Sequence, residues 1–205
     1  MNDKTRRRVL RFSRFICLLL RLMGRLEVRG VQNIPHGGFV AAGNHRSTAD
    51  GIVAFRALIR HGNGQPVVFM ATRGVFRIPV VGKVMLRMGF IPVHRGDTRT
   101  ATTGQVALEG AQAAVKDGCI MGMYPRGGIS TAENVRRMKG GVFRLYEAGA
   151  TVVPMVSTGA ERLIPPGCWF PRFWRTVTIE FMPPVSPGLD KATMLATLDH
   201  TLYGA

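Results

Sequence analysis

The sequence predicts an α/β fold in which helices flank a mostly parallel central sheet. Short apolar runs rich in β-branched residues alternate along the chain with longer stretches whose apolar residues recur every three or four positions. This alternation is typical of strands and helices that are wound into a largely parallel sheet. The 205 residues, 46% of them hydrophobic, suffice for one substantial core and are too few for two full domains. We therefore expect one domain over residues 27–205 and an appendage over residues 1–26.

Within this domain the strands and helices are expected to follow one another with short turns between them. The expected strands are residues 26–29, 39–42, 67–70, 89–95, 119–123, 151–156 and 175–181. The expected helices are one that begins near residue 48 and continues through 52–59, and those at 79–88, 98–116, 140–148 and 191–203.

Residues 1–26 have the pattern of a basic amphipathic helix. Arginines recur at intervals of three, four or seven positions, so they form one stripe, while Phe, Ile, Leu and Met occupy the other side. The longest uninterrupted apolar run is residues 15–20, whereas a membrane-spanning helix needs about 20 residues. The segment is thus predicted to lie on an anionic membrane surface. We expect a peripheral or monotopic protein on the cytoplasmic face of the cell membrane.

The charge distribution supports an anionic partner. The formal net charge is +16, and residues 1–25 contain eight Lys or Arg against Asp3, which gives +7 there and +9 over the rest. A cleavable signal peptide, a helix that packs only on its own domain and a nucleic-acid-binding helix are the alternatives to membrane docking. Nucleic acid is not expected, because basic and aromatic residues do not interleave on a surface motif.

The cysteines and histidines do not indicate a cofactor. Cys17, Cys119 and Cys168 are odd in number and far apart, which fits neither a disulfide framework nor a metal site and favours a reducing compartment. The five histidines have no spacing that would gather three or four zinc ligands. We expect no metal and no bound cofactor.

Residues 44–51 form the turn between the second expected strand and the helix that follows it. Open α/β sheets place their chemistry at such turns. Ser47 or Thr48 can cap the helix, which leaves His45 in the turn and Asp50 in the first helical turn. Because the chain bends between them, one nitrogen of His45 can bond to Asp50 while the other stays free. The pair is a candidate general base with a fixed tautomer.

His45-x4-Asp50, with Asn44 before it and Gly51 after it, resembles the signature of the glycerolipid acyltransferase family, typified by 1-acylglycerol-3-phosphate acyltransferases. The resemblance implies that His45 and Asp50 are catalytic. The motif-bearing part of the resemblance covers residues 39–158.

A second element of the resemblance ends at Arg95. This residue lies at the carboxyl end of an expected strand, where its guanidinium can grip a phosphate through two hydrogen bonds. The family has a Gly-x-Ile-x-Val-x-Arg segment whose arginine binds the phosphate of the acceptor, and Gly89, Ile91 and Val93 complete the match here. The resemblance therefore implies that Arg95 is a substrate-binding residue.

The third element is the glycine-rich turn at residues 124–130, whose backbone N–H groups can approach an anionic ligand. The family pattern is usually Phe-Pro-Glu-Gly-Thr-Arg-Ser, which Gly127 and Ser130 match. Arg126 stands where glutamate is expected, so the charge is reversed at a position that the family uses to bind its acceptor. Two interpretations are open: Arg126 contributes a second phosphate contact, or it marks an impaired enzyme or an altered sequence.

Two further stretches complete the resemblance. Lys139 matches the Lys-x-Gly that follows the third element, and residues 152–156 match an apolar strand with a central proline that lines the acyl or acceptor pocket. Substrate binding is thus expected at Arg95, Arg126, Gly127, Ser130 and Lys139.

The resemblance implies an acyltransferase that moves a fatty acyl group from acyl-CoA or acyl carrier protein to the free hydroxyl of 1-acylglycerol 3-phosphate and gives phosphatidic acid. The alternatives are another lysophospholipid or lipid alcohol as acceptor, or a catalytically impaired lipid-binding member. Acyl-CoA or acyl carrier protein would act as co-substrate, and a lysophospholipid acceptor and an anionic membrane surface are the expected partners.

Overall fold

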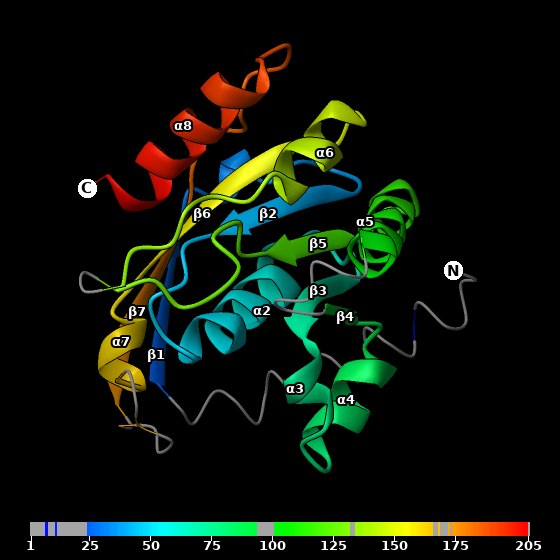
Figure 1. Cartoon of the computed structure of the whole chain (residues 1–205). Coiled ribbons are helices and arrows are strands. Elements are labelled where there is room, and N and C mark those ends of the chain that lie inside the picture. The colour runs from blue at the N-terminus through cyan, green and yellow to red at the C-terminus, as the bar shows by residue number, and fades with distance from the viewer. Residues whose placement is uncertain are drawn as a thin grey trace.

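The described residues build a seven-stranded sheet whose strand order is β1-β7-β6-β2-β5-β3-β4 (Figure 1). The structure is a computed structural model that describes Arg7, Arg11 and residues 24–93, 101–131, 134–165, 168, 172 and 174–204. The strands are β1 (Gly24–Arg29), β2 (Phe39–Gly43), β3 (Val67–Thr72), β4 (Ile91–Val93), β5 (Ile120–Met123), β6 (Val152–Thr158) and β7 (Arg175–Phe181).

Five of these strands run in the same direction. β2 pairs in parallel with both β5 and β6, and β3 pairs in parallel with both β4 and β5. β7 is antiparallel to β6, and β1 is parallel to β7, so the reversed strands lie together at one side of the sheet. The α/β class with a mostly parallel sheet is confirmed.

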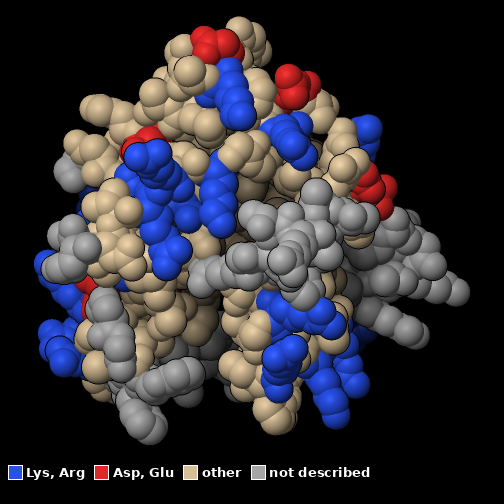
Figure 2. Space-filling view, in the orientation of Figure 1, with Lys and Arg blue, Asp and Glu red and all other residues tan. Residues whose placement is uncertain are grey.

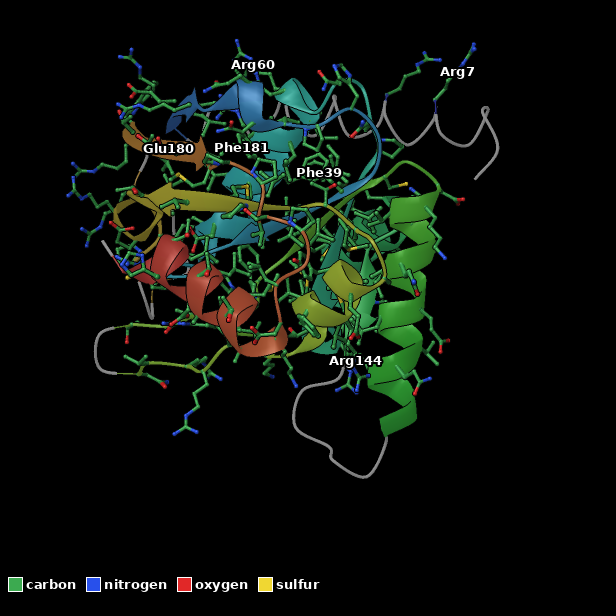
Figure 3. The ribbon with its side chains drawn as sticks, turned by 90° about the horizontal axis from the view of Figure 1, so that it is seen from above. Arg7, Phe39, Arg60, Arg144, Glu180 and Phe181 are labelled. Atoms are coloured by element: carbon green, nitrogen blue, oxygen red, sulfur yellow. The ribbon has the colours of Figure 1, made fainter. Side chains whose placement is uncertain are left out.

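The described helices cover both faces of this sheet. They are η2 (Val31–Asn33), α2 (Ala49–His61), α3 (Arg73–Phe76), α4 (Val81–Arg87), α5 (Ala101–Lys116), α6 (Gly141–Glu147), α7 (Ala160–Leu163) and α8 (Lys191–Tyr203). α2 and α4 lie on one face, while α5, α6 and α8 lie on the other (Figure 1). In Figure 3, Phe39 and Phe181 lie in the interior, whereas Arg60 and Arg144 lie on opposite outer surfaces.

Strand β2 shows why the sheet needs both helical layers. All five of its residues are buried. Phe39 and Ala41 pack in the cluster with α2, and Val40 and Ala42 pack in the cluster with α5, α6 and α8. Successive side chains of a strand point to opposite faces, so a continuous apolar run requires a covered sheet on both sides.

The strands and helices predicted within residues 27–205 exist, with differences at their bounds. Residues 24–26, predicted as the end of the N-terminal helix, instead begin β1, because they pair in register with the first residues of β7. One helix is predicted over residues 79–88. The structure instead has two short helices, α3 and α4, which are separated by Arg77–Val80. α7 was not predicted, since four residues are too few to show a helical period.

The remainder of the N-terminal segment cannot be compared with its prediction, because residues 1–23 lie outside the described residues except for Arg7 and Arg11. Within the described ranges, no helix combines the length and the apolar character that crossing a membrane requires.

Candidate active site

The carboxyl ends of β2, β5 and β6 meet at one edge of the sheet, and the candidate site is built there. His45 follows β2 by two residues, and Tyr124 directly follows the neighbouring strand β5. Asn44 is buried and bridges to β6: its amide nitrogen donates to the carbonyl of Ser157 (2.9 Å) and its amide oxygen accepts from the Ser157 N–H (2.7 Å). These two bonds fix the chain immediately before His45.

Asp50 is the centre of the turn at residues 44–50, which carries the candidate base and is called the catalytic turn below. Its carboxylate is almost fully buried at the first turn of α2, where one oxygen, Oδ2, accepts hydrogen bonds from the backbone N–H groups of Arg46 and Ser47, both at 2.7 Å. The same oxygen lies 3.3 Å from Nδ1 of His45. The positive end of the helix dipole and the two N–H donors stabilise the negative charge of this carboxylate.

The pairing with Asp50 defines the chemistry of the imidazole. When Nδ1–H of His45 donates to the carboxylate, Nε2 is the unprotonated nitrogen and can accept a proton. The side chain of His45 is 17% exposed, so the ring is shielded on most sides and still accessible. The geometry therefore supplies a general base with an oriented tautomer.

The ring of Tyr124 forms one wall of the site. It stacks on the imidazole of His45 with 4.2 Å between ring centroids and 17° between planes. A Cβ atom at Gly43 would lie 2.9 Å from the Tyr124 ring, so the last residue of β2 has to be glycine for the tyrosine to occupy this position. The hydroxyl of Tyr124 is buried without a hydrogen-bond partner among the described residues.

Two hydrogen bonds hold the backbone of His45 to two other parts of the chain. Its N–H donates to the hydroxyl of Tyr203 on α8 at 3.0 Å. Its carbonyl accepts from the N–H of Ser130, in the glycine-rich turn, at 2.7 Å. The catalytic turn is thus attached both to the 124–130 turn and to the last helix of the described chain.

Arg126 connects the 124–130 turn to α8. Its Nε and Nη2 donate to the two carboxylate oxygens of Asp199 on α8 at 2.9 and 3.0 Å, and its Nη1 donates to Oγ of Ser130 at 3.0 Å. The guanidinium also lies over the ring of Tyr203, with Cζ 3.6 Å from the centroid. Arg126 is only 8% exposed. Its planar fork matches a carboxylate and an aromatic face together, which a lysine cannot do.

The remaining predicted site residues have different positions. Gly127 has a φ of 69°, which favours glycine, and the Nζ of Lys139 would lie 2.9 Å from a Cβ atom built on it. Lys139 is exposed, and its backbone N–H donates to the carbonyl of Pro125. The structure therefore brings Arg126, Gly127 and Ser130 together in the 124–130 turn, which contacts His45 through Ser130, and places Lys139 beside that turn. Arg95 lies outside the described residues.

Sequence reasoning missed Asp199 and Tyr203, and it did not assign a role to Tyr124. Asp199 and Tyr203 are four positions apart in α8, so they share one face of the helix. This spacing was the available signal, but it does not identify the loop that the face contacts. Within the described residues, His, Cys, Asp and Glu do not form a group of three or more that could hold a metal ion.

Replacing Arg126 by alanine is expected to lower the free energy of unfolding by about 1–3 kcal/mol, because Asp199 and Ser130 lose a charged donor. Chemical denaturation measures this loss. Arg137→Ala, at an exposed position in the same region, is the control and should change the free energy of unfolding by less than about 0.5 kcal/mol. If the effects of Arg126→Ala and Asp199→Ala add fully in the double variant, the proposed pairing is wrong.

Tyr124 provides a second test, at high pH. Burial raises the pKa of Tyr124 well above its ordinary value, and the charge of Asp50 raises it further. Above pH of about 10, tyrosines ionise in the unfolded chain while Tyr124 keeps its proton in the folded chain, so the folded state binds more protons and stability falls as pH rises. The slope is at most about 1.4 kcal/mol per pH unit for this group.

Tyr124→Phe should therefore reduce the alkaline loss of stability, measured by urea denaturation at a series of pH values. Burial also raises the pKa of Tyr203, so part of the slope should remain in the variant. Equal slopes for the two proteins would contradict the expected burial of the Tyr124 hydroxyl.

Comparison with known proteins places this chain in a family. The sequence model of the acyltransferase family matches residues 25–158. A chloroplastic 1-acyl-sn-glycerol-3-phosphate acyltransferase of Brassica napus is 30% identical over 146 residues, which cover 70% of this chain and 40% of that protein. A 1-acyl-sn-glycerol-3-phosphate acyltransferase of Borreliella burgdorferi is 26% identical over 133 residues, or 64% of this chain and 50% of the relative.

A solved structure supports the same assignment at the level of the fold. The crystal structure of the 1-acyl-sn-glycerophosphate acyltransferase PlsC from Thermotoga maritima superimposes with a TM-score of 0.71 at 19% sequence identity, over 98% of this chain and 80% of that one. The chain spans half or less of the length of the two curated relatives described above. With the family match covering residues 25–158 and the His45–Asp50 pair at the edge of the sheet, the chain belongs to the glycerolipid acyltransferase family.

Proposed function

We propose that this chain transfers a fatty acyl group from a thioester, acyl-CoA or acylated acyl carrier protein, to the free hydroxyl of 1-acylglycerol 3-phosphate and so produces phosphatidic acid. The observation that carries the proposal is the 3.3 Å contact between Nδ1 of His45 and Oδ2 of Asp50. Oriented pairs of this kind activate hydroxyl nucleophiles. The relatives whose names include 1-acyl-sn-glycerol-3-phosphate acyltransferase support the choice of acceptor.

In the proposed reaction, Nε2 of His45 takes the proton of the acceptor hydroxyl while the hydroxyl oxygen attacks the thioester carbonyl carbon. The tetrahedral intermediate then collapses: the new C–O ester bond remains, the C–S bond breaks, and the thiolate takes the proton back from the imidazolium. Asp50 holds the imidazole during this cycle and stabilises its charged form. The acyl group passes directly between the substrates, without an acyl-enzyme intermediate.

The phosphate of the acceptor is proposed to bind at the 124–130 turn. Lys139 lies against Gly127 and carries an exposed ammonium group, which suits a phosphate at this position. Arg95 remains a proposed phosphate ligand on the strength of the sequence pattern alone. A phosphate held here would fix the acceptor hydroxyl in attacking geometry, which lowers the entropy cost of the reaction.

Arg126 calls for a role different from the two that the sequence left open. Its three side-chain nitrogens donate to Asp199 and Ser130. These contacts support a brace between the 124–130 turn and α8, and Ser130 connects that turn to the backbone of His45. On this proposal the reversed charge at position 126 is matched by the carboxylate of Asp199, and the site keeps its activity.

Two alternatives remain as proposals beside this one. Gly128 and Ile129 depart from the family's usual threonine and arginine, which favours another lysophospholipid or a lipid alcohol as acceptor. A catalytically impaired lipid-binding member is the other alternative. The docking of residues 1–26 on the cytoplasmic face of a membrane also stays a prediction.

Replacing His45 by alanine should lower kcat by at least about 100-fold, because proton transfer in the transition state loses its base. The assay uses labelled acyl-CoA and acyl carrier protein with 1-acylglycerol 3-phosphate, a panel of other lysophospholipids and glycerol 3-phosphate. His36→Ala, at an exposed position in a turn, is the matched control and should retain activity. Unchanged acyl transfer by folded His45→Ala protein would refute the mechanism.

A further inference from the structure

A second feature of the structure fits a membrane surface. The α3–α4 hairpin, residues 73–87, presents exposed apolar side chains to solvent. Ile78, Val80, Val81 and Leu86 are 42%, 71%, 43% and 57% exposed. These are half of the eight exposed large hydrophobic residues of the described chain, and they lie within nine positions. Scattered single apolar residues are normal on a surface, whereas a cluster of this kind marks an interaction site.

The same hairpin is strongly basic. Arg73, Arg77, Lys83 and Arg87 are exposed on it, and the sequence contains no Asp or Glu between Asp50 and Asp97. In Figure 2, Lys and Arg side chains gather at the lower end of the molecule, where Figure 1 places α3 and α4, and no acidic side chain lies among them on this face. Long basic side chains around an apolar centre can keep their charges at lipid headgroups while their stems lie along acyl chains.

The hairpin is held firmly in the position that exposes these residues. Met88, immediately after α4, is buried in the core, and Val84 packs against that core. A Cβ atom at Gly82 would lie 2.0 Å from the carbonyl oxygen of Phe76, so α4 touches the backbone of α3. Val80, between the two helices, has a φ of 67°, an unfavourable conformation for a β-branched residue, and yet it remains the most exposed of the four apolar residues.

The hairpin lies at the carboxyl ends of the parallel strands, as His45 does. α3 begins at Arg73, directly after β3 ends at Thr72. β3 is parallel to β5, and β5 is parallel to β2, so the carboxyl ends of all three strands point to the same edge. A surface that bound this hairpin would therefore lie on the side of the molecule where the catalytic turn is.

We infer that the α3–α4 hairpin docks on the headgroup region of an anionic lipid leaflet, with its four apolar residues inserted and with Arg77, Lys83 and Arg87 on lipid phosphates. This inference rests on the proposed function for its use, which is to bring the catalytic turn to an acceptor that resides in the membrane. An acidic protein would match the charge as well. The projecting apolar tip favours lipid, because insertion between headgroups needs exposed apolar side chains ahead of the charged ones.

Vesicle sedimentation of the full chain tests the inference. Wild-type protein is expected to bind vesicles of phosphatidylcholine mixed with phosphatidylglycerol more strongly than pure phosphatidylcholine vesicles. Val80→Asp/Leu86→Asp and Lys83→Glu/Arg87→Glu should each weaken binding to the mixed vesicles at least about tenfold. The matched control is Val106→Asp/Val135→Asp, at residues 60% and 67% exposed elsewhere on the molecule, and it should bind as the wild type does.

The outcomes separate the docking surface from the proposed reaction. The hairpin variants should keep wild-type turnover of a short-chain lysophosphatidic acid that is dispersed as monomers, which also shows that they fold. If the folded hairpin variants bind vesicles as strongly as the wild type does, the inference is overturned. The same holds if the variants keep their vesicle binding but lose binding of acidic acyl carrier protein, because the hairpin would then bind a protein. If the wild type shows no acyl transfer at all but binds vesicles through the hairpin, the proposed function fails and the docking surface stands.

Discussion

The buried carboxylate of Asp50 is the group on which the rest of the site depends. Asp50 is only 1% exposed, so its carboxylate has to recover its lost hydration from nearby donors, and two backbone N–H groups of its own turn provide them. Those donors exist only while residues 46–50 keep their tight path into α2. The backbone conformation that gives Asp50 these hydrogen bonds also brings His45 next to its carboxylate. Burial of Asp50 therefore determines how the imidazole of His45 is oriented.

This local arrangement is supported from distant parts of the chain. Tyr203 accepts a hydrogen bond from His45 across a sequence separation of 158 residues, and Asp199 reaches Arg126 across 73. Asn44 fixes the same turn to β6. A general base works only when its geometry is held to a fraction of an ångström, and three strands and a helix contribute to that precision here. The packing of α8 therefore helps to position the proposed base.

The sequence predicted the features that depend on local contacts. It did not predict those that depend on contacts between distant parts of the chain. The His45–Asp50 pair was predictable because both residues lie in one turn, and the sheet was predictable because strands such as β2 are apolar on both faces. The role of Arg126 was not predictable, since its partner Asp199 is adjacent to it only after α8 packs. Likewise the stacking of Tyr124 on His45 depends on β5 being the neighbour of β2, which no local pattern specifies.

The position of β7 shows how the bounds of the family match compare with the bounds of the sheet. The match to the acyltransferase family ends at residue 158, but β7 lies beyond it and is the strand that connects β1 to β6. Without β7, the residues that open the family match would lose their ladder, and a sheet edge that is paired in the intact chain would be exposed. The region that sequence comparison delimits as the acyltransferase is therefore smaller than the sheet that contains it. A fragment that keeps every strand of the described sheet has to extend to Phe181, and one that keeps the hydrogen bond to the backbone of His45 has to extend to Tyr203.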